Sequence, residues 1–204
     1  MTAPHGGPPY NDPVAWKVAL IGTHGVGKTT LCFDLAARLK RLDVDVDMVR
    51  EVARACPLPI NRDTTVAAQE WILHTQMAWE IEAEARHDVV LCDRSVIDNY
   101  CYLVHAAGPQ PAWEALLDRW LPTYGLLVKV PIWRRPSYDG VRAVDPAFQE
   151  RIDTLLEGVI TARGLEPLRL EPGERERWPE RILDRVLPVV QPTPPLFGPD
   201  ELAP

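Results

Sequence analysis

The sequence predicts a three-layer α/β domain, in which helices cover both faces of a mainly parallel five-stranded sheet. Short apolar runs alternate along the chain with longer segments that have helical spacing. Alternation of strands and helices implies parallel strands joined by right-handed crossovers. A glycine-rich turn, GTHGVGKTT at residues 22–30, joins the first apolar run to the first helical segment. The 204 residues are enough for one domain with a proper core.

The first half of the chain supplies three strands and two helices. Residues 18–21, Val-Ala-Leu-Ile, predict a short strand, and a helix is expected over 28–41. Residues 44–50 alternate Val and Asp before becoming apolar, which indicates a strand partly at an edge. A long helix is expected over 65–86. Residues 89–92, Val-Val-Leu-Cys, have the β-rich composition of a buried parallel strand.

Proline and glycine delimit the elements that follow. A helix is expected over 96–107, ending at Gly108-Pro109, and another over 113–121, ending at Pro122. Residues 126–130 predict a fourth strand.

The last third begins with a clear helix signal. Asp145-Pro146 places an N-cap aspartate before a first-turn proline, and Gly164 ends the helical pattern. Residues 165–170 predict the fifth strand, and residues 178–189 predict the last helix. The domain is therefore expected over 15–190.

Both ends of the chain are rich in proline. Such segments bury too little surface to offset their ordering entropy, so disordered tails are expected at 1–14 and 191–204.

Composition excludes several classes of protein. A net charge of −7 gives no basic field for non-specific nucleic-acid binding, although a local basic groove remains possible. No apolar run reaches the roughly 20 residues that span a bilayer, and the N-terminus lacks a secretory pattern, so a cytoplasmic protein is expected. The four scattered cysteines predict buried, reduced thiols.

The turn at residues 22–30 matches the phosphate-binding pattern G-x-x-x-x-G-K-[ST] in full. Its glycines let the backbone present N–H groups to phosphate oxygens, and the following helix adds a positive dipole end. Lys28 is expected to reach the β- and γ-phosphates of ATP, and the Thr29 hydroxyl to bind Mg²⁺. The nucleotide-binding set is Gly22, Thr23, His24, Gly25, Val26, Gly27, Lys28, Thr29 and Thr30.

Other motifs narrow the class of phosphate-loop protein. The N-K-x-D and D-x-x-G motifs of GTP switches are absent, and the chain is short for a ring-forming AAA+ motor. The third strand leads instead into Asp93-Arg94-Ser95. With the phosphate loop, this D-R-S sequence resembles the small P-loop kinases related to nucleoside and nucleotide kinases. The group typified by the ribosylnicotinamide kinase domain is the most similar, over roughly residues 16 to 188.

The resemblance implies roles for residues at the carboxyl edge of the sheet. Asp93 would accept the proton of the attacking hydroxyl or hold Mg²⁺, and Arg94 would contact phosphate. Glu51, after the second strand, would face the acceptor's sugar hydroxyls. Arg54 would bind an acceptor phosphate, against the alternative of an ordinary surface charge, and Gln69 on the long helix would read a base edge.

A lid is expected over approximately 131–145, because this loop is rich in Arg, Gly and Pro and precedes a firm helix start. It resembles the lid of nucleotide kinases, whose arginines stabilise the transferring phosphoryl group. Arg135 and Arg142 are the preferred lid residues, ahead of Arg134.

The leading functional hypothesis is an Mg²⁺- and ATP-dependent kinase that phosphorylates a hydroxyl of a nucleoside-like small molecule. One alternative keeps this chemistry but places the acceptor hydroxyl on DNA or RNA. The other is a regulatory nucleotide-binding ATPase with no acceptor. The sequence leaves the acceptor's identity and the oligomeric state open.

Overall fold

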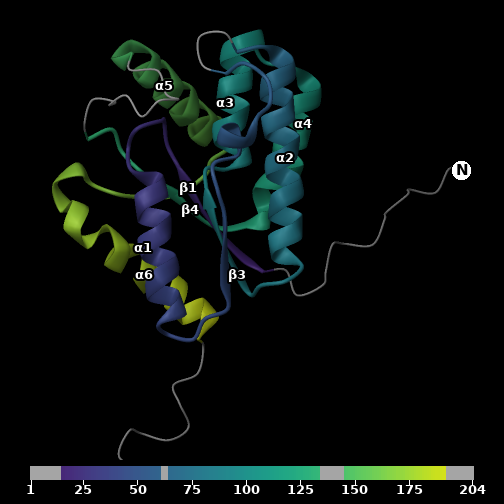
Figure 1. Ribbon diagram of the computed structural model, residues 1–204. Helices are drawn as coiled ribbons and strands as arrows, with labels where there is room; N and C mark the ends of the chain where they lie inside the picture. The colour runs from purple at the N-terminus through teal and green to yellow at the C-terminus, as the bar shows by residue number, and fades with distance from the viewer. Residues whose placement is uncertain (1–14, 61–63, 134–144, 192–204) are drawn as a thin grey trace, which may run out of the picture.

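The structure, a computed structural model, describes residues 15–60, 64–133 and 145–191 (Figure 1). It contains a five-stranded sheet in the order β2-β3-β1-β4-β5, in which each pair of neighbouring strands is parallel. The predicted α/β class and parallel sheet are therefore confirmed. The strands are β1 (Trp16–Ile21), β2 (Val46–Val49), β3 (Val89–Asp93), β4 (Tyr124–Lys129) and β5 (Leu168–Arg169).

Helices cover both faces of the sheet, which gives three layers (Figure 1). Strand β1 shows how the layers are held. Val18 and Leu20 point into one apolar core and Ala19 and Ile21 into the other, as the two-residue period of a strand requires. The first core is shared with α1 (Lys28–Lys40) and α6 (Trp178–Val190). The second is shared with α2 (Val66–Glu84), α3 (Val96–Ala107), α4 (Pro111–Trp120) and α5 (Pro146–Ala162).

The two edge strands are shorter than predicted. β2 spans four residues and β5 only two, where 44–50 and 165–170 were expected. Both lie at sheet edges and pair on one side only, so fewer ladder hydrogen bonds extend them. The Val/Asp alternation of β2 is nevertheless informative, because Val46 and Val49 are buried whereas Asp47 is exposed.

Helix ends follow the local signals in the sequence. Asp145 caps α5 by accepting a 3.0 Å hydrogen bond from Ala147 N, and Gly164 follows the helix with φ 59°. Gly108 ends α3 with φ 74°. At the start of α3, Ser95 and Asp98 form a capping box, which fixes the chain directly after β3.

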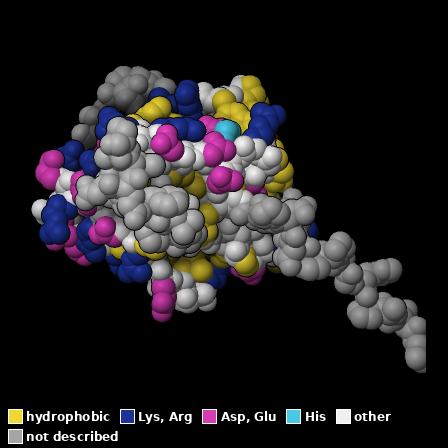
Figure 2. All heavy atoms as spheres, turned by 90° about the horizontal axis from the view of Figure 1, so that it is seen from below, with side chains coloured by type: hydrophobic (Ala, Val, Ile, Leu, Met, Phe, Trp, Pro, Cys, Tyr) yellow, Lys and Arg dark blue, Asp and Glu magenta, His cyan; other side chains and the backbone are white. Residues whose placement is uncertain are grey.

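The surface carries mixed charge on the face shown in Figure 2, where Lys and Arg side chains lie among Asp and Glu side chains. This face therefore has no uniformly positive field of the kind that attracts nucleic acid. Among the described residues, no helix combines the length and apolar character needed to cross a membrane.

A pair of Gly→Ala substitutions tests the backbone geometry around the phosphate loop. Gly22 has φ 150°, and a Cβ built there would lie 2.7 Å from Val130 O, so Gly22→Ala should destabilise the protein by about 1–3 kcal/mol. Gly158 is exposed inside α5 and its Cβ would meet nothing within 4 Å, so Gly158→Ala should stabilise by about 0.5–1 kcal/mol. Urea denaturation measures both, and effects of the same sign would contradict this reading of the loop.

Candidate active site

The phosphate loop connects β1 to α1, as the sequence predicted. Gly25 and Gly27 have φ values of 76° and 96°, a region that glycine adopts at little cost. Gly27 is also the N-cap of α1, and no side chain caps this helix end. The first N–H groups of α1 therefore remain available to an anion, as in other helix N-termini that bind phosphate.

Lys28 is buried inside the loop and binds the loop's own backbone. Its Nζ donates to Gly22 O at 2.6 Å and to Thr23 O at 2.7 Å. Burial, followed by the nearby Arg94 guanidinium, lowers the pKa of Lys28 to about 7, against the opposing effect of Asp98 and Asp93. An anionic ligand would supply a negative charge next to this ammonium, whose two hydrogen-bond acceptors are neutral carbonyl oxygens.

Thr29 and Asp93 bring two hard oxygen atoms together at the carboxyl ends of β1 and β3. Thr29 Oγ1 donates to Asp93 Oδ2 at 2.5 Å. Burial raises the pKa of Asp93, although Lys28 and the Thr29 hydrogen bond oppose the shift. A hydroxyl and a carboxylate are ligands that suit Mg²⁺, which takes its remaining ligands from water and phosphate. No group of three or more His, Cys, Asp or Glu residues that could hold a metal occurs in the described ranges.

Glu51 lies between two arginines. Its Oε1 accepts from Arg94 Nε at 2.9 Å, and its Oε2 accepts from Arg54 Nε at 3.0 Å. Arg94 is buried and has φ 98°, which is uncommon for a residue with a side chain, whereas the Arg54 side chain is 44% exposed. The pairing orients the Glu51 carboxylate at the carboxyl end of β2.

Asp98 connects the phosphate loop to α3. Its Oδ1 accepts from Gly22 N at 2.9 Å, while Oδ2 accepts from Ser95 N at 2.9 Å and from Ser95 Oγ at 2.9 Å. Because Asp98 is fully buried, these bonds fix the start of the loop relative to the D-R-S turn.

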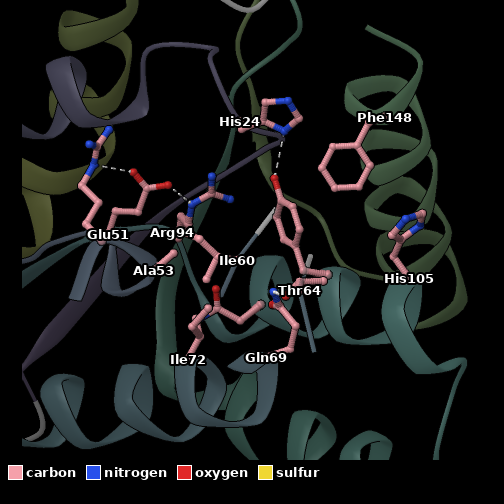
Figure 3. Close-up of a pocket in the computed structure, with 13 residues that line it drawn as sticks. His24, Glu51, Ala53, Ile60, Thr64, Gln69, Ile72, Arg94, His105 and Phe148 are labelled. Atoms are coloured by element: carbon pink, nitrogen blue, oxygen red, sulfur yellow. Dashed lines mark hydrogen bonds and ion pairs between the residues drawn. The ribbon is translucent and has the colours of Figure 1, made fainter. Parts of the chain in front are cut away.

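A pocket opens beside the phosphate loop, between η1 (Val52–Ala55), α2, α3 and α5 (Figure 3). His24 forms its boundary with the loop, and its Nδ1 lies 3.1 Å from Tyr102 Oη. Phe148 packs 5.4 Å from the His24 ring and 5.1 Å from the His105 ring, centroid to centroid. The lining residues are His24, Glu51, Ala53, Arg54, Ile60, Thr64, Gln69, Ile72, Arg94, Asn99, Tyr102, His105 and Phe148.

Apart from loop residues 22–29 and Asp93, the residues predicted from the sequence fall into three groups. Glu51, Arg54, Gln69 and Arg94 all line the pocket, and Gln69 Nε2 donates to Thr64 Oγ1 at 2.7 Å. Thr30 is exposed on α1. Arg134, Arg135 and Arg142 lie outside the described residues, as does most of the expected lid.

Several pocket residues carry no signal in the sequence. Asn99, Tyr102 and His105 follow the D-R-S motif on α3, and Phe148 is one of several apolar residues in α5. The sequence pattern predicts His24 as part of the nucleotide-binding loop, and in the structure its side chain also lines the pocket. Only the packing of α5 on α3 brings these side chains together.

The lowered pKa of Lys28 predicts that the protein takes up a proton when it binds a nucleotide. At pH 8 a group with a pKa of about 7 is mostly neutral, and a bound polyphosphate should restore the proton. Phosphate itself, with a second pKa of about 6, is already ionised at that pH. Titration calorimetry in buffers of different ionisation enthalpy should therefore show uptake of about one proton on nucleotide binding. Lys28→Arg, which stays charged, is the control, and wild-type heats independent of the buffer would refute the shift.

The same pKa affects stability in the free protein. The folded-state value of about 7 lies below the ordinary value of 10.5, so the folded protein binds fewer protons than the unfolded chain between these pH values. Stability should therefore rise with pH across this window because of Lys28, and its contribution is least favourable below pH 7.

The parallel sheet, with the phosphate loop after β1 and an acidic residue at the end of β3, defines the class of P-loop nucleotide-binding domains. Within it, the chain belongs to an AAA domain family, whose model matches residues 17–181. No curated protein shows significant similarity to the chain.

Solved structures with the same fold include two of the deoxyadenosine kinase from M. mycoides. The one with products dCMP and a flexible dCDP has a TM-score of 0.57 and 14% identity, covering 85% of this chain and 100% of that one. The one with bound dATP has a TM-score of 0.54 and 13% identity, covering 84% and 98%. The NadR protein in complex with NAD and AMP-PNP has a TM-score of 0.61 and 18% identity, over 91% of this chain but only 52% of NadR. These likenesses establish the nucleoside-kinase-like P-loop fold.

Proposed function

We propose that the protein is an Mg²⁺-dependent phosphotransferase that moves the γ-phosphate of ATP to a hydroxyl of a nucleoside-like small molecule. The observation that carries this proposal is the pocket that adjoins the phosphate loop, with His24 and Arg94 at the boundary. A regulatory ATPase needs only the loop, whereas a kinase needs a second chamber at the loop's γ-phosphate end. The similar solved structures support the proposal, because each was determined with nucleotides bound.

On the donor side, the loop N–H groups and Lys28 would hold the β- and γ-phosphates. Thr29 and Asp93 would hold Mg²⁺, whose charge would offset that of the phosphates. Arg94 projects from the adjoining turn, and its Nη1 is buried without a hydrogen-bond partner among the described residues. This guanidinium would therefore contact the transferring phosphoryl group, with Arg135 and Arg142 as the proposed lid arginines.

On the acceptor side, Glu51 is the carboxylate that lines the pocket, whereas Asp93 faces Thr29. We therefore assign Glu51 to orienting the acceptor hydroxyl and Asp93 mainly to the metal. Phosphoryl transfer passes through a loose transition state, so positioning by Glu51 matters more than strong basicity.

The remaining walls suit a flat heterocycle with polar edges. Phe148 and Tyr102 provide aromatic surface, and Ile60 and Ile72 add apolar surface. Asn99 Nδ2 is buried and has no hydrogen-bond partner among the described residues. Together with Gln69, it would form hydrogen bonds to the polar edges of a base. Arg54, at the mouth, would meet an acceptor phosphate if one is present.

The proposal is tested by incubating the protein with Mg²⁺ and γ-labelled ATP against nucleosides, nucleotides, ribosylnicotinamide and 5′-hydroxyl oligonucleotides. Label should move to a nucleoside-like acceptor in the wild type and not in Lys28→Ala or Asp93→Asn. Label on oligonucleotides alone, with a KM that rises steeply with salt, would replace the small-molecule acceptor with nucleic acid. Release of inorganic phosphate that is indifferent to every acceptor and survives Asp93→Asn would overturn the kinase.

A further inference from the structure

Glu80, near the C-terminal end of α2, is fully buried and accepts hydrogen bonds from donors on three other elements as well as on its own helix. Its Oε1 accepts from Tyr124 Oη at 2.8 Å and from Gln76 Nε2 at 2.9 Å. Its Oε2 accepts from Trp120 Nε1 at 2.8 Å and from Lys17 Nζ at 3.1 Å. Nothing in the proposed phosphoryl transfer uses this cluster directly.

Two of these donors also contact the D-R-S turn. Gln76 Nε2 donates to Arg94 O at 3.3 Å, and Tyr124 Oη accepts from Val96 N at 3.0 Å. These bonds hold the two peptide groups that flank Ser95, one on each side. Glu80 is thus one side chain removed from the backbone that carries Arg94.

The turn is the part of the site that most needs such support. Arg94 has φ 98°, and a residue with a side chain keeps such a conformation only where its surroundings fix it. This backbone is the base from which the Arg94 side chain extends to its contacts, in which Arg94 Nε donates to Glu51 and the guanidinium lies 5.1 Å from the Tyr102 ring centroid.

We propose that Glu80 is a positioning residue, which acts through Gln76 and Tyr124 to hold the Arg94–Ser95–Val96 backbone in the conformation that aims Arg94 at the active site. The catalytic consequence rests on the proposed function, whereas the backbone consequence does not. Burial, followed by the Glu80 charge, raises the pKa of Tyr124 well above its usual value, so its hydroxyl remains a donor at any working pH.

Two variants separate positioning from general stability. Tyr124→Phe removes one hydrogen bond to Glu80 together with the contact to Val96. Trp120→Phe also removes one hydrogen bond to Glu80, and it removes more side-chain volume than Tyr124→Phe does. It keeps the hydrogen bond between Val96 N and Tyr124 Oη. If Glu80 only stabilised the fold, Trp120→Phe would be at least as harmful.

The first readout is amide hydrogen exchange at Ser95, whose N–H donates to Asp98 and not to Tyr124. Exchange should accelerate about tenfold in Tyr124→Phe and stay near the wild-type rate in Trp120→Phe. The second readout is phosphoryl transfer, in which Tyr124→Phe should lower kcat about tenfold or more and change acceptor KM little, since misplacement of about 1 Å is costly.

The outcomes discriminate between the two proposals. Unchanged Ser95 exchange in Tyr124→Phe, or equal acceleration in both variants, overturns the positioning role whatever the enzyme does. Accelerated exchange with wild-type kcat shows that the turn does not set Arg94, which also overturns it. A wild-type protein with no transferase activity, but with the predicted exchange difference, removes the proposed function and leaves the backbone inference standing.

Discussion

Replacing Lys28 with alanine is expected to lower phosphoryl transfer by about 10³-fold or more, while the thermal midpoint stays within a few degrees of the wild type. The activity falls because Lys28 is the cation placed inside the phosphate loop, where burial makes its charge act strongly on a bound phosphate. Stability is spared for the same reason. Burial of the ammonium costs folding free energy at neutral pH. The alanine variant no longer bears this cost, which offsets the loss of the two hydrogen bonds to Gly22 O and Thr23 O.

Lys40→Ala is the matched control, since Lys40 ends the same helix but is 56% exposed. Its removal should leave both activity and stability close to those of the wild type. The experiment combines steady-state kinetics, nucleotide affinity by calorimetry, and a thermal melt. Lys28→Ala protein that binds the nucleotide as tightly as the wild type would show that the phosphates lie elsewhere.

Replacing Lys17 with methionine is expected to be the most destabilising of the substitutions considered, at about 3–5 kcal/mol. The Lys17 and Glu80 side chains are both fully buried, with Nζ 3.1 Å from Glu80 Oε2, and Nζ also pairs with Glu84. Lys17 Nζ further lies 4.6 Å from the centroid of the Trp120 ring. Methionine fills much of the same volume, so the loss measures uncompensated buried charge rather than a cavity.

The exposed pair Lys40–Asp45, at 3.4 Å, provides the comparison for Lys17. Lys40→Met should cost less than about 1 kcal/mol in the same urea titration. The double variant Lys17→Met with Glu80→Gln should recover part of the loss, because the uncompensated charge is then reduced. A cost for Lys17→Met as small as that for Lys40→Met would mean that water reaches the cluster.

The central strands and the phosphate loop could be predicted from the sequence because their signals are local. The β1 run and the loop GTHGVGKTT are contiguous, and each loop position has its own physical requirement. Asp93 also follows a recognisable buried strand, so its place at the sheet edge beside Thr29 could be expected. The edge strands were less predictable, since little beyond Leu168–Arg169 pairs in β5.

The pocket beside the phosphate loop and the Glu80 cluster could not be predicted, because both depend on contacts between distant segments. Phe148 reads as an ordinary core residue of α5, and only the packing of helices places it against His24. Glu80 lies in a stretch of α2 that also contains Glu82 and Glu84, and no local signal in the sequence sets it apart as buried. Its burial follows from Lys17 and Tyr124, which lie 63 residues before it and 44 residues after it in the chain.

The Asp98 carboxylate has a consequence for how the two ligands influence each other. It binds the first N–H of the phosphate loop with one oxygen and the start of α3 with the other, while α3 supplies Asn99 and Tyr102 to the pocket. If a ligand in the pocket displaced α3, the Asp98 hydrogen bond would therefore transmit the displacement to Gly22. Binding free energies at two coupled sites are reciprocal, so whatever factor the acceptor imposes on nucleotide affinity, the nucleotide imposes on acceptor affinity. If the proposed acceptor displaces α3, Asp98 is the side chain that would transmit the change to the phosphate loop and couple the two binding steps.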